Sequence, residues 1–166
     1  MAILGSGGAG KTTVALELGE RTGLPVVHLD LLNWAPGWVP RPHEEFRVAL
    51  ADAVADDRWI LDGNFLEGDA GDPRFGRADT VVFLDLPRRT SIRRAVARRV
   101  RDRGKQRPDL PEGCEEEIEL WFLRWMWSYP NKVRPRVLAI LAGLGPGVEV
   151  HHLRSDAEVR RFLDSV

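Results

Sequence analysis

Several features are scarce in this sequence of 166 residues, and each scarcity excludes a class of protein. Cys114 is the single cysteine, so an internal disulfide cannot form and the composition fits a reducing compartment. No apolar run is long enough to span a bilayer, and the chain does not open with a basic segment followed by a long apolar core. Internal repeats and low-complexity linkers are also missing. We therefore expect one soluble, cytoplasmic domain over residues 1–166, with no membrane partner.

The net charge of −1 conceals an uneven distribution of charge along the chain. Residues 88–107 contain ten basic side chains and one acidic side chain, whereas residues 112–119 contain five glutamates. The basic segment could close over a polyphosphate, contact a nucleic acid, or form a solvated face that pairs with the nearby glutamates. The local pattern is thus more informative about partners than the total charge is.

The most specific motif lies at residues 5–12, GSGGAGKT, which fit G-x-x-x-x-G-K-[ST] at each fixed position. Such a segment forms a loop whose backbone N–H groups surround a phosphate at the N-terminus of a helix. In this motif the lysine, here Lys11, reaches the β- and γ-phosphates, and the hydroxyl of Thr12 ligates Mg²⁺. Apolar residues 2–4 before the loop and amphipathic residues 13–18 after it supply the strand and helix that the motif requires.

The motif therefore predicts binding of ATP or another nucleoside triphosphate with Mg²⁺. The residues predicted to hold the nucleotide are Gly5, Ser6, Gly7, Gly8, Ala9, Gly10, Lys11, Thr12 and Thr13.

Apolar runs alternate with segments of helical periodicity along the rest of the chain. The predicted strands are residues 26–29, 59–61, 80–84 and 148–153, and the predicted helices are residues 44–54, 90–103, 115–129, 132–144 and a last helix opened by a capping box at 155–158. The run TVVFL at 80–84 is apolar throughout, which is typical of a parallel strand covered on both faces. The alternation predicts an α/β fold with a parallel sheet.

Carboxylates follow three of the predicted strands, at Asp30, Asp62 and Asp85. Ligands of such sheets bind beyond the carboxyl ends of the strands, so each is a candidate site residue. Asp62 or Asp85 could hold Mg²⁺ beside the loop, and either could instead cap a turn. Asp30 could bind a substrate hydroxyl or accept its proton, or could cap the next segment.

Other candidates rest on weaker patterns. Arg94, Arg98 and Arg101 share one face of their predicted helix, where arginines could stabilise a transferring phosphoryl group. Arg154 and Ser155 follow the last strand, at a plausible edge of a base pocket. Trp34 and Trp38 could stack on a substrate ring or pack into a groove. We expect core or surface roles for His28, His151 and His152, which lack metal-ligand spacing, and a core role for most aromatic side chains of residues 121–129.

Taken together, these segments resemble a known family, the small P-loop proteins related to adenylate kinase that are often labelled DNA topology modulation proteins. The resemblance runs over nearly the whole chain, through residues 5–13, 28–30, 34–38, 59–64, 78–87, 103–105, 107–109, 112–114 and 121–127. It implies a P-loop NTPase fold with a five-stranded parallel sheet in the order 2-3-1-4-5 and helices on both faces. It also implies a short arginine-rich lid at about residues 98–113.

The resemblance also implies roles for individual residues. Asp62, rather than Asp85, matches the kinase aspartate that orders Mg²⁺, and Arg94 and Arg98 match arginines that contact the donor. Residues 28–30 are similar to the segment of small-metabolite kinases that carries the substrate-side aspartate, which supports Asp30 as an acceptor-binding residue. Adenylate kinases continue with Phe-Pro-Arg where this chain has residues 64–66, Asn-Phe-Leu, and this departure speaks against a nucleoside monophosphate acceptor.

The sequence as a whole predicts a Mg²⁺- and ATP-dependent phosphotransferase that acts on a small-molecule or nucleotide acceptor. Lys11, Arg94 and Arg98 would stabilise the transferring group, Thr12 and Asp62 would organise the metal, and Asp30 would engage the acceptor. The alternative is a nucleotide-regulated protein whose basic helix binds nucleic acid, in a manner that weakens steeply with salt.

Overall fold

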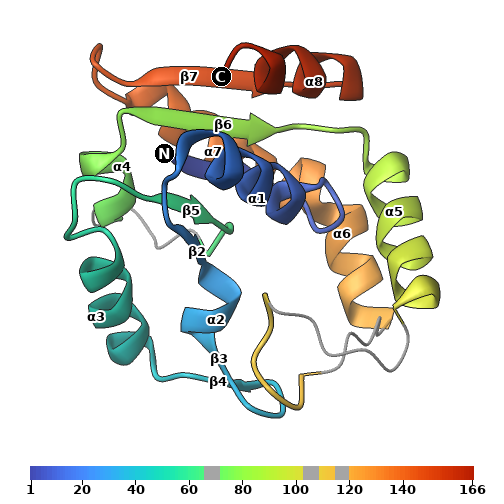
Figure 1. Ribbon diagram of the computed structural model, residues 1–166. Helices are drawn as coiled ribbons and strands as arrows, with labels where there is room; N and C mark the ends of the chain where they lie inside the picture. Colours follow the sequence, from blue (N-terminus) through green and yellow to red (C-terminus); the bar gives the residue numbers. More distant parts are fainter. Residues whose placement is uncertain (66–71, 103–108, 115–119) are drawn as a thin grey trace.

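The computed structural model describes residues 1–65, 72–102, 109–114 and 120–166. Its centre is a parallel sheet of β1 (Ala2–Gly5), β2 (Val26–His28), β5 (Ile60–Asp62), β6 (Thr80–Leu84) and β7 (Glu149–Leu153) (Figure 1). The five strands lie in the order β2-β5-β1-β6-β7. Numbered along the chain as the strands of this sheet, this is the order 2-3-1-4-5, so the predicted fold is confirmed. The strand that leads into the glycine-rich motif is central.

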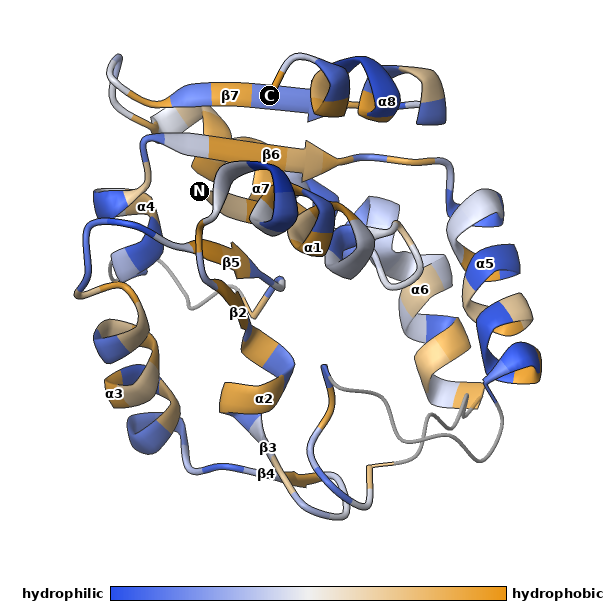
Figure 2. Ribbon diagram, in the orientation of Figure 1, coloured by the Kyte–Doolittle hydropathy of each residue, from blue (hydrophilic) through white to orange (hydrophobic). Residues whose placement is uncertain are grey.

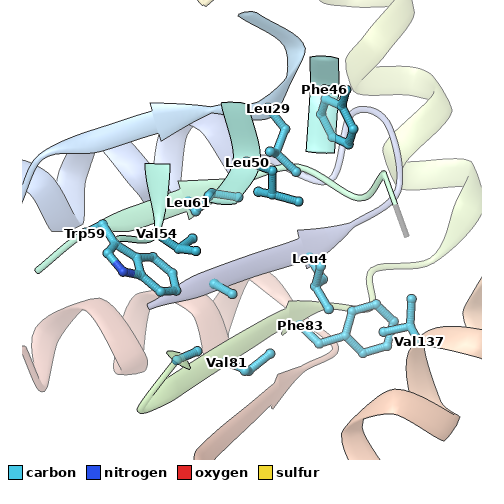
Figure 3. Close-up of a cluster of buried hydrophobic side chains, with 12 residues drawn as sticks. Leu4, Leu29, Phe46, Leu50, Val54, Trp59, Leu61, Val81, Phe83 and Val137 are labelled. Atoms are coloured by element: carbon cyan, nitrogen blue, oxygen red, sulfur yellow. The ribbon is translucent and has the colours of Figure 1, made fainter. Parts of the chain in front are cut away.

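Each strand of the sheet centre buries side chains on both faces. One face packs against α2 (Leu29–Asn33), α3 (His43–Ala53) and α7 (Arg134–Gly143), and the other packs against α1 (Lys11–Thr22) and α8 (Asp156–Asp164). Phe83 points to the first face, between Leu4 and Val137 (Figure 3), whereas Val82 and Leu84 point to the second. Figure 2 shows β6 as hydrophobic over most of its length, with a paler start, as the apolar run predicts.

The parallel register brings the ends of three strands together at one edge of the sheet. Ile3 pairs with Asp62, and Asp62 also pairs with His28 on its other side. Strand β1 continues two residues beyond its last pair with β5, and its final residue, Gly5, pairs with Leu84 of β6. Side chains that follow these strands can therefore meet beside the motif, as the topology of such sheets requires.

The segment after β2 differs from the prediction. The strand ends at His28 rather than Leu29, and the short helix α2 follows it directly. The Gly/Pro-rich stretch beyond α2 forms a two-stranded hairpin of β3 (Trp34–Ala35) and β4 (Val39–Pro40). Gly37 has φ 76° and Trp38 has φ 60°, and these two left-handed residues reverse the chain. The Trp34 and Trp38 rings meet edge to face, with centroids 5.5 Å apart, and this contact holds the hairpin closed.

The helices of the C-terminal half also depart from their predicted limits. Helix α6 (Leu120–Lys132) continues through Pro130, where we expected a break, and the chain turns at Val133 before α7. Met126 and Tyr129 are buried just before the proline, and their packing favours the helix although Pro130 cannot donate a hydrogen bond to it. Helix α5 (Arg88–Arg101) begins two residues earlier than predicted and ends within the lid candidate. The centre of that candidate, 103–108, and the predicted helical residues 115–119 lie outside the described residues.

The remaining described elements are short or terminal. Helix α4 (Pro73–Arg77) lies between β5 and β6 in the chain. Ser155 is the N-cap of α8, and its side chain accepts a hydrogen bond from the Glu158 N–H as the capping box predicts. Over the described ranges, no helix has both the length and the hydropathy needed to cross a bilayer.

Candidate functional site

The glycine-rich loop connects β1 to the N-terminus of α1, as the motif predicts. The first hydrogen bond of the helix runs from the Val14 N–H to the Gly10 carbonyl (3.0 Å), and no side chain caps Gly10. The N–H groups of residues 10–13 therefore precede the first helical bond and point out of the helix end, where an anion would accept them. The ammonium group of Lys11 lies over the loop, 3.3 Å from the Ser6 carbonyl oxygen. The end of α1 thus offers backbone donors and a cation to a phosphate.

The loop is pressed closely against α5 and α6, which lie side by side in Figure 1. A methyl group on Gly8 would come 2.2 Å from the Ser91 carbonyl oxygen of α5, and one on Gly7 would come 2.9 Å from Cζ of Phe122 on α6. Gly8 also has φ 72°, a conformation that side-chain-bearing residues rarely adopt. These contacts fix the loop against the two helices that flank the predicted lid.

A hydrogen-bonded group of three side chains stands beside the loop. Thr12 Oγ1 donates to Asp62 Oδ2 at 2.8 Å, and His28 Nδ1 lies 3.2 Å from the same oxygen. An ionised carboxylate can only accept hydrogen bonds, so Nδ1 of His28 carries the proton. Asp62 Oδ1 is buried and has no hydrogen-bond partner among the described residues. A buried oxygen of this kind is satisfied when a cation or water binds beside it.

The protonation equilibria of Asp62 and His28 are linked. Burial pushes the pKa of Asp62 upward, but the hydrogen bond from His28, the charge of Lys11 and the hydrogen bond from Thr12 outweigh it, so the pKa lies below its ordinary value. The hydrogen bond to Asp62 raises the pKa of His28 against the effect of burial, and the charges of Asp109 and Asp30 act in the same direction. Asp62 is therefore an anion at neutral pH, as a metal-binding carboxylate must be.

The donor atoms at this position fit a magnesium ion that also binds the nucleotide. Within the part of the chain that the structure describes, no three His, Cys, Asp or Glu side chains cluster so as to hold a metal alone. Mg²⁺ is commonly held by one or two protein oxygens, with phosphates and water as its other ligands. Thr12 Oγ1 and the free oxygen of Asp62 are suitable protein ligands, and the neighbouring helix end is suitable for the phosphates.

The carboxylate after β6 has different partners. Nε of Arg134 lies 2.9 Å from each oxygen of Asp85, and Nε2 of His152 lies 2.7 Å from Oδ2. Burial pushes the pKa of Asp85 upward, but the hydrogen bonds from Arg134 and His152 outweigh it and hold the pKa below its ordinary value. Asp85 thus ties β6 to β7 and to the first turn of α7.

The other residues predicted to contact the donor lie on α5 and at the start of α8. Nη2 of Arg94 is 2.7 Å from Asp156 Oδ2, so Arg94 joins α5 to α8 in this state of the molecule. Arg98 lies on the same helix and is half-buried. Arg154 is exposed and contacts His152, and Ser155 caps α8. The roles of these four residues at the donor stay predictions, as does the alternative in which the basic helix binds nucleic acid.

The predicted acceptor residue Asp30 lies on α2, two residues beyond His28. The hairpin that follows α2 is joined to residues 109–114: Cys114 Sγ accepts a hydrogen bond from the Trp38 N–H at 3.2 Å and lies 3.6 Å from the Ala35 carbonyl oxygen. Cys114 is fully buried, although its sequence neighbours are polar. The end of the lid candidate is thereby attached to the hairpin beside α2, as Figure 1 shows.

His28 and Arg74 were not assigned to the site from the sequence, whereas Asn64 was noted at a predicted strand end without a role. His28 was assigned a core or surface role, although its position at the end of a parallel strand beside Asp62 was a usable signal. Asn64 binds both backbone groups of Gly5, and the buried Arg74 binds the residues after β5. No local pattern distinguishes Arg74, because it lies in a segment without helical or strand periodicity.

No family model matches the chain. A protein of Thermococcus onnurineus (strain NA1), described as "Putative adenylate kinase", is 29% identical over 118 residues, which cover 71% of this chain and 63% of that protein. The chain thus spans less than two thirds of the length of this relative. The resemblance to the group labelled DNA topology modulation proteins stays a prediction.

Solved structures of small-molecule kinases superpose on nearly the whole chain. A shikimate kinase from Bacteroides thetaiotaomicron has a TM-score of 0.58 at 17% identity, covering 99% of this chain and 93% of that one. A shikimate kinase from Acinetobacter baumannii in complex with shikimate gives 0.54 at 17% identity, covering 99% and 88%. A gluconokinase from Sinorhizobium meliloti 1021 gives 0.51 at 15% identity, covering 99% and 93%. At these identities the likeness shows the fold, and the chain has the α/β fold of the P-loop kinases.

Proposed function

We propose that this chain is a Mg²⁺- and ATP-dependent kinase that transfers a phosphoryl group to a small acceptor. The observation that carries the proposal is the 2.8 Å hydrogen bond between Thr12 Oγ1 and Asp62 Oδ2 at the N-terminus of α1. A hydroxyl and a carboxylate together at the end of a phosphate-binding loop are the two protein ligands that a nucleotide-bound Mg²⁺ needs. When bound, Mg²⁺ would neutralise charge on the phosphates during transfer.

The chain's own residues would bind and orient the phosphates of ATP, the phosphoryl donor. The N–H groups at the start of α1 would bind the phosphate oxygens, and Lys11 would move from the Ser6 carbonyl oxygen to the transferring phosphoryl group. Arg94 and Arg98 would add positive charge from α5, which requires Arg94 to leave Asp156 when the nucleotide binds. Arg154 and Ser155 would border the base.

On the acceptor side, we propose that Asp30 binds the hydroxyl group that receives the phosphoryl group. The fold neighbours whose names include shikimate and gluconate act on hydroxyl-bearing compounds, which supports a hydroxyl acceptor. The relative named as an adenylate kinase keeps a nucleotide acceptor open. The acceptor is therefore to be found by measuring ATP consumption against nucleosides, nucleotides and small metabolites.

The first test replaces the loop lysine. Lys11→Ala should weaken Mg²⁺–ATP binding by at least about 100-fold and abolish ATP consumption, because it removes the cation that faces the β- and γ-phosphates. Arg160→Ala, which removes a positive charge from an exposed position of α8, is the matched control and should change neither quantity. Calorimetry gives the affinity, and a coupled assay gives the rate. Unchanged affinity and rate in Lys11→Ala would refute the proposal.

A second variant tests the acceptor role within the same assay. Asp30→Asn should reduce phosphoryl transfer by at least about 100-fold while leaving ATP affinity within about twofold, because it removes only the group that accepts the hydroxyl proton. Asp52→Asn on α3 is an exposed control of equal charge change. If Asp30→Asn lost ATP affinity instead, Asp30 would belong to the donor site.

A further inference from the structure

A buried arginine on the short helix α4, Arg74, binds the segment that follows β5. The side chain of Arg74 is completely buried, which is rare for a charged residue and requires that its charge be paired. Its Nε lies 2.9 and 3.0 Å from the two carboxylate oxygens of Asp72, which is also nearly fully buried. Asp72 additionally caps α4 by accepting a hydrogen bond from the Arg74 N–H. The pair is therefore fixed in position by its own helix.

Arg74 also binds the chain that leaves β5, through Nη1 and through Nη2, which in addition contacts Asp72 Oδ2. Nη1 donates to the Gly63 carbonyl oxygen at 2.9 Å, and Nη2 donates to the carbonyl oxygens of Asn64 at 2.8 Å and Phe65 at 3.2 Å. Three consecutive carbonyl groups thus converge on one guanidinium group. Only arginine has a planar fork with enough donors for this arrangement, because the ammonium group of lysine is a compact point charge.

Asn64, held in this way, binds the first residue of the loop through its side chain. Its Oδ1 accepts a hydrogen bond from the Gly5 N–H at 3.0 Å, and its Nδ2 donates to the Gly5 carbonyl oxygen at 2.6 Å. The backbone ladder between β1 and β5 ends earlier, at the bond from the Gly63 N–H to the Ile3 carbonyl oxygen. The side-chain amide of Asn64 therefore takes the place of the next peptide group of β5.

Gly5 is consequently fixed on both sides. On one side it pairs with Leu84 of β6, and on the other side it is held by Asn64. The backbone donors for phosphate come a few residues later, so a shift of Gly5 would move them. Groups that hold metal ligands in place typically contribute about 10–100-fold to metal affinity without touching the metal, and we expect a smaller effect of the same kind for a backbone that binds phosphate.

We infer that Arg74 is a positioning residue of the nucleotide site and that it acts through Asn64. The inference rests on the proposed function, since the loop it positions is the proposed ATP site. Arg74 fixes the backbone of residues 63–65 through its hydrogen bonds. This backbone orients the Asn64 amide toward Gly5, which is the first residue of the phosphate-binding loop. Nothing in this sequence of contacts requires Arg74 to touch the nucleotide.

The test is a double-mutant cycle on ATP affinity, made from Asn64→Ala, Arg74→Lys and the double variant, with Mg²⁺–ATP binding measured by calorimetry. We expect Asn64→Ala to weaken binding about tenfold and Arg74→Lys about fivefold. If Arg74 acts through Asn64, the double variant should be no weaker than about tenfold rather than the roughly fiftyfold expected for independent sites. Additive losses, or an Arg74→Lys variant with unchanged ATP affinity, would overturn the inference.

Two further variants separate positioning from loss of stability. Val54→Ala leaves a cavity in the buried cluster beside α3 and should lower the free energy of unfolding without changing ATP affinity. If Arg74→Lys does not fold, Asp72→Asn takes its place in the cycle, with the same expected non-additivity, because it removes the anion that orients the guanidinium group. Independent losses while Lys11→Ala still abolishes ATP binding would overturn the positioning role alone. Unchanged ATP binding in Lys11→Ala would instead overturn the proposed function.

Discussion

The carboxyl ends of β5 and β6 lie on either side of the central strand and carry the same residue types. Each strand is apolar, each is followed or ended by an aspartate, and each aspartate is paired with a histidine of the neighbouring edge strand. At β5 the pair is Asp62 with His28 of β2, and at β6 the pair is Asp85 with His152 of β7. The sheet therefore has two similar aspartate–histidine pairs at the carboxyl ends of its strands, one on each side of β1.

The third partner makes the two ends different. Asp85 is neutralised by the guanidinium group of Arg134, whose Nη2 lies 2.8 Å from Oδ2, so its charge is used within the protein. Asp62 has the neutral hydroxyl of Thr12 instead, and its other oxygen has no partner within the described ranges. A carboxylate whose charge is not neutralised by an arginine, and which lies beside a helix N-terminus, can bind a metal cation. A carboxylate that is paired with arginine is suited to a structural role. The comparison thus assigns different tasks to residues that look alike in sequence.

The largest expected difference is in catalysis. Asp62→Asn should reduce Mg²⁺-dependent ATP turnover by about 100-fold, because it removes the negative charge that would hold the metal. Asp85→Asn should leave turnover within about twofold, since its carboxylate is already neutralised by Arg134. The measurement is ATP turnover as a function of Mg²⁺ concentration in both variants. Equal losses in the two variants would contradict the division of tasks.

The next largest difference is in stability without ligand, and it follows from the third partners. Arg134→Met leaves the mostly buried Asp85 carboxylate without its cation and should lower the free energy of unfolding by about 1–3 kcal/mol. Thr12→Val removes one hydrogen bond from Asp62, which keeps His28, and should cost about 1 kcal/mol or less. Urea unfolding without nucleotide measures both values. In the presence of Mg²⁺ and ATP, Thr12→Val should become the less stable of the two variants. Only this variant has a lower affinity for the ligand that stabilises the folded state.

From the sequence, an aspartate was predicted at each of the two strand ends, and the family resemblance favoured Asp62 over Asp85 for the metal, but the partners of the two aspartates were not predicted. The phosphate-binding loop was predicted from a fixed motif, and the strands were predicted from apolar runs such as residues 80–84. The order of the strands was implied by the family resemblance. The partners of the two aspartates are distant in the chain, since His28 and Asp62 are 34 residues apart and Asp85 and Arg134 are 49 residues apart. Which side chain completes each pair depends on tertiary distances that periodicity does not encode.

The same reasoning explains other features that were not predicted from the sequence. The hairpin after α2 depends on a left-handed tryptophan, Trp38, a conformation that its residue type does not predict. Cys114 lies among polar residues in sequence but is buried against that hairpin. The buried position of Arg74 contradicts the usual preference of arginine for the surface. The conformation or burial of each of these residues is determined by tertiary contacts rather than by local propensity.

The smallest expected difference is in the pH dependence of stability. The pKa of His28 is raised in the folded protein, chiefly by its hydrogen bond to Asp62, so protonated His28 favours folding. That contribution is fully present below the ordinary histidine pKa of about 6.5 and is lost as the pH rises through the higher, folded-state pKa. Without ligand, the free energy of unfolding should therefore fall as the pH rises above about 6.5 and through the folded-state pKa of His28. Asp62→Asn should remove this decline, whereas Asp85→Asn should keep it, and titrations of the other groups cancel in the comparison of the two variants. A decline that survived Asp62→Asn would show that His28 is not coupled to the β5 carboxylate in solution.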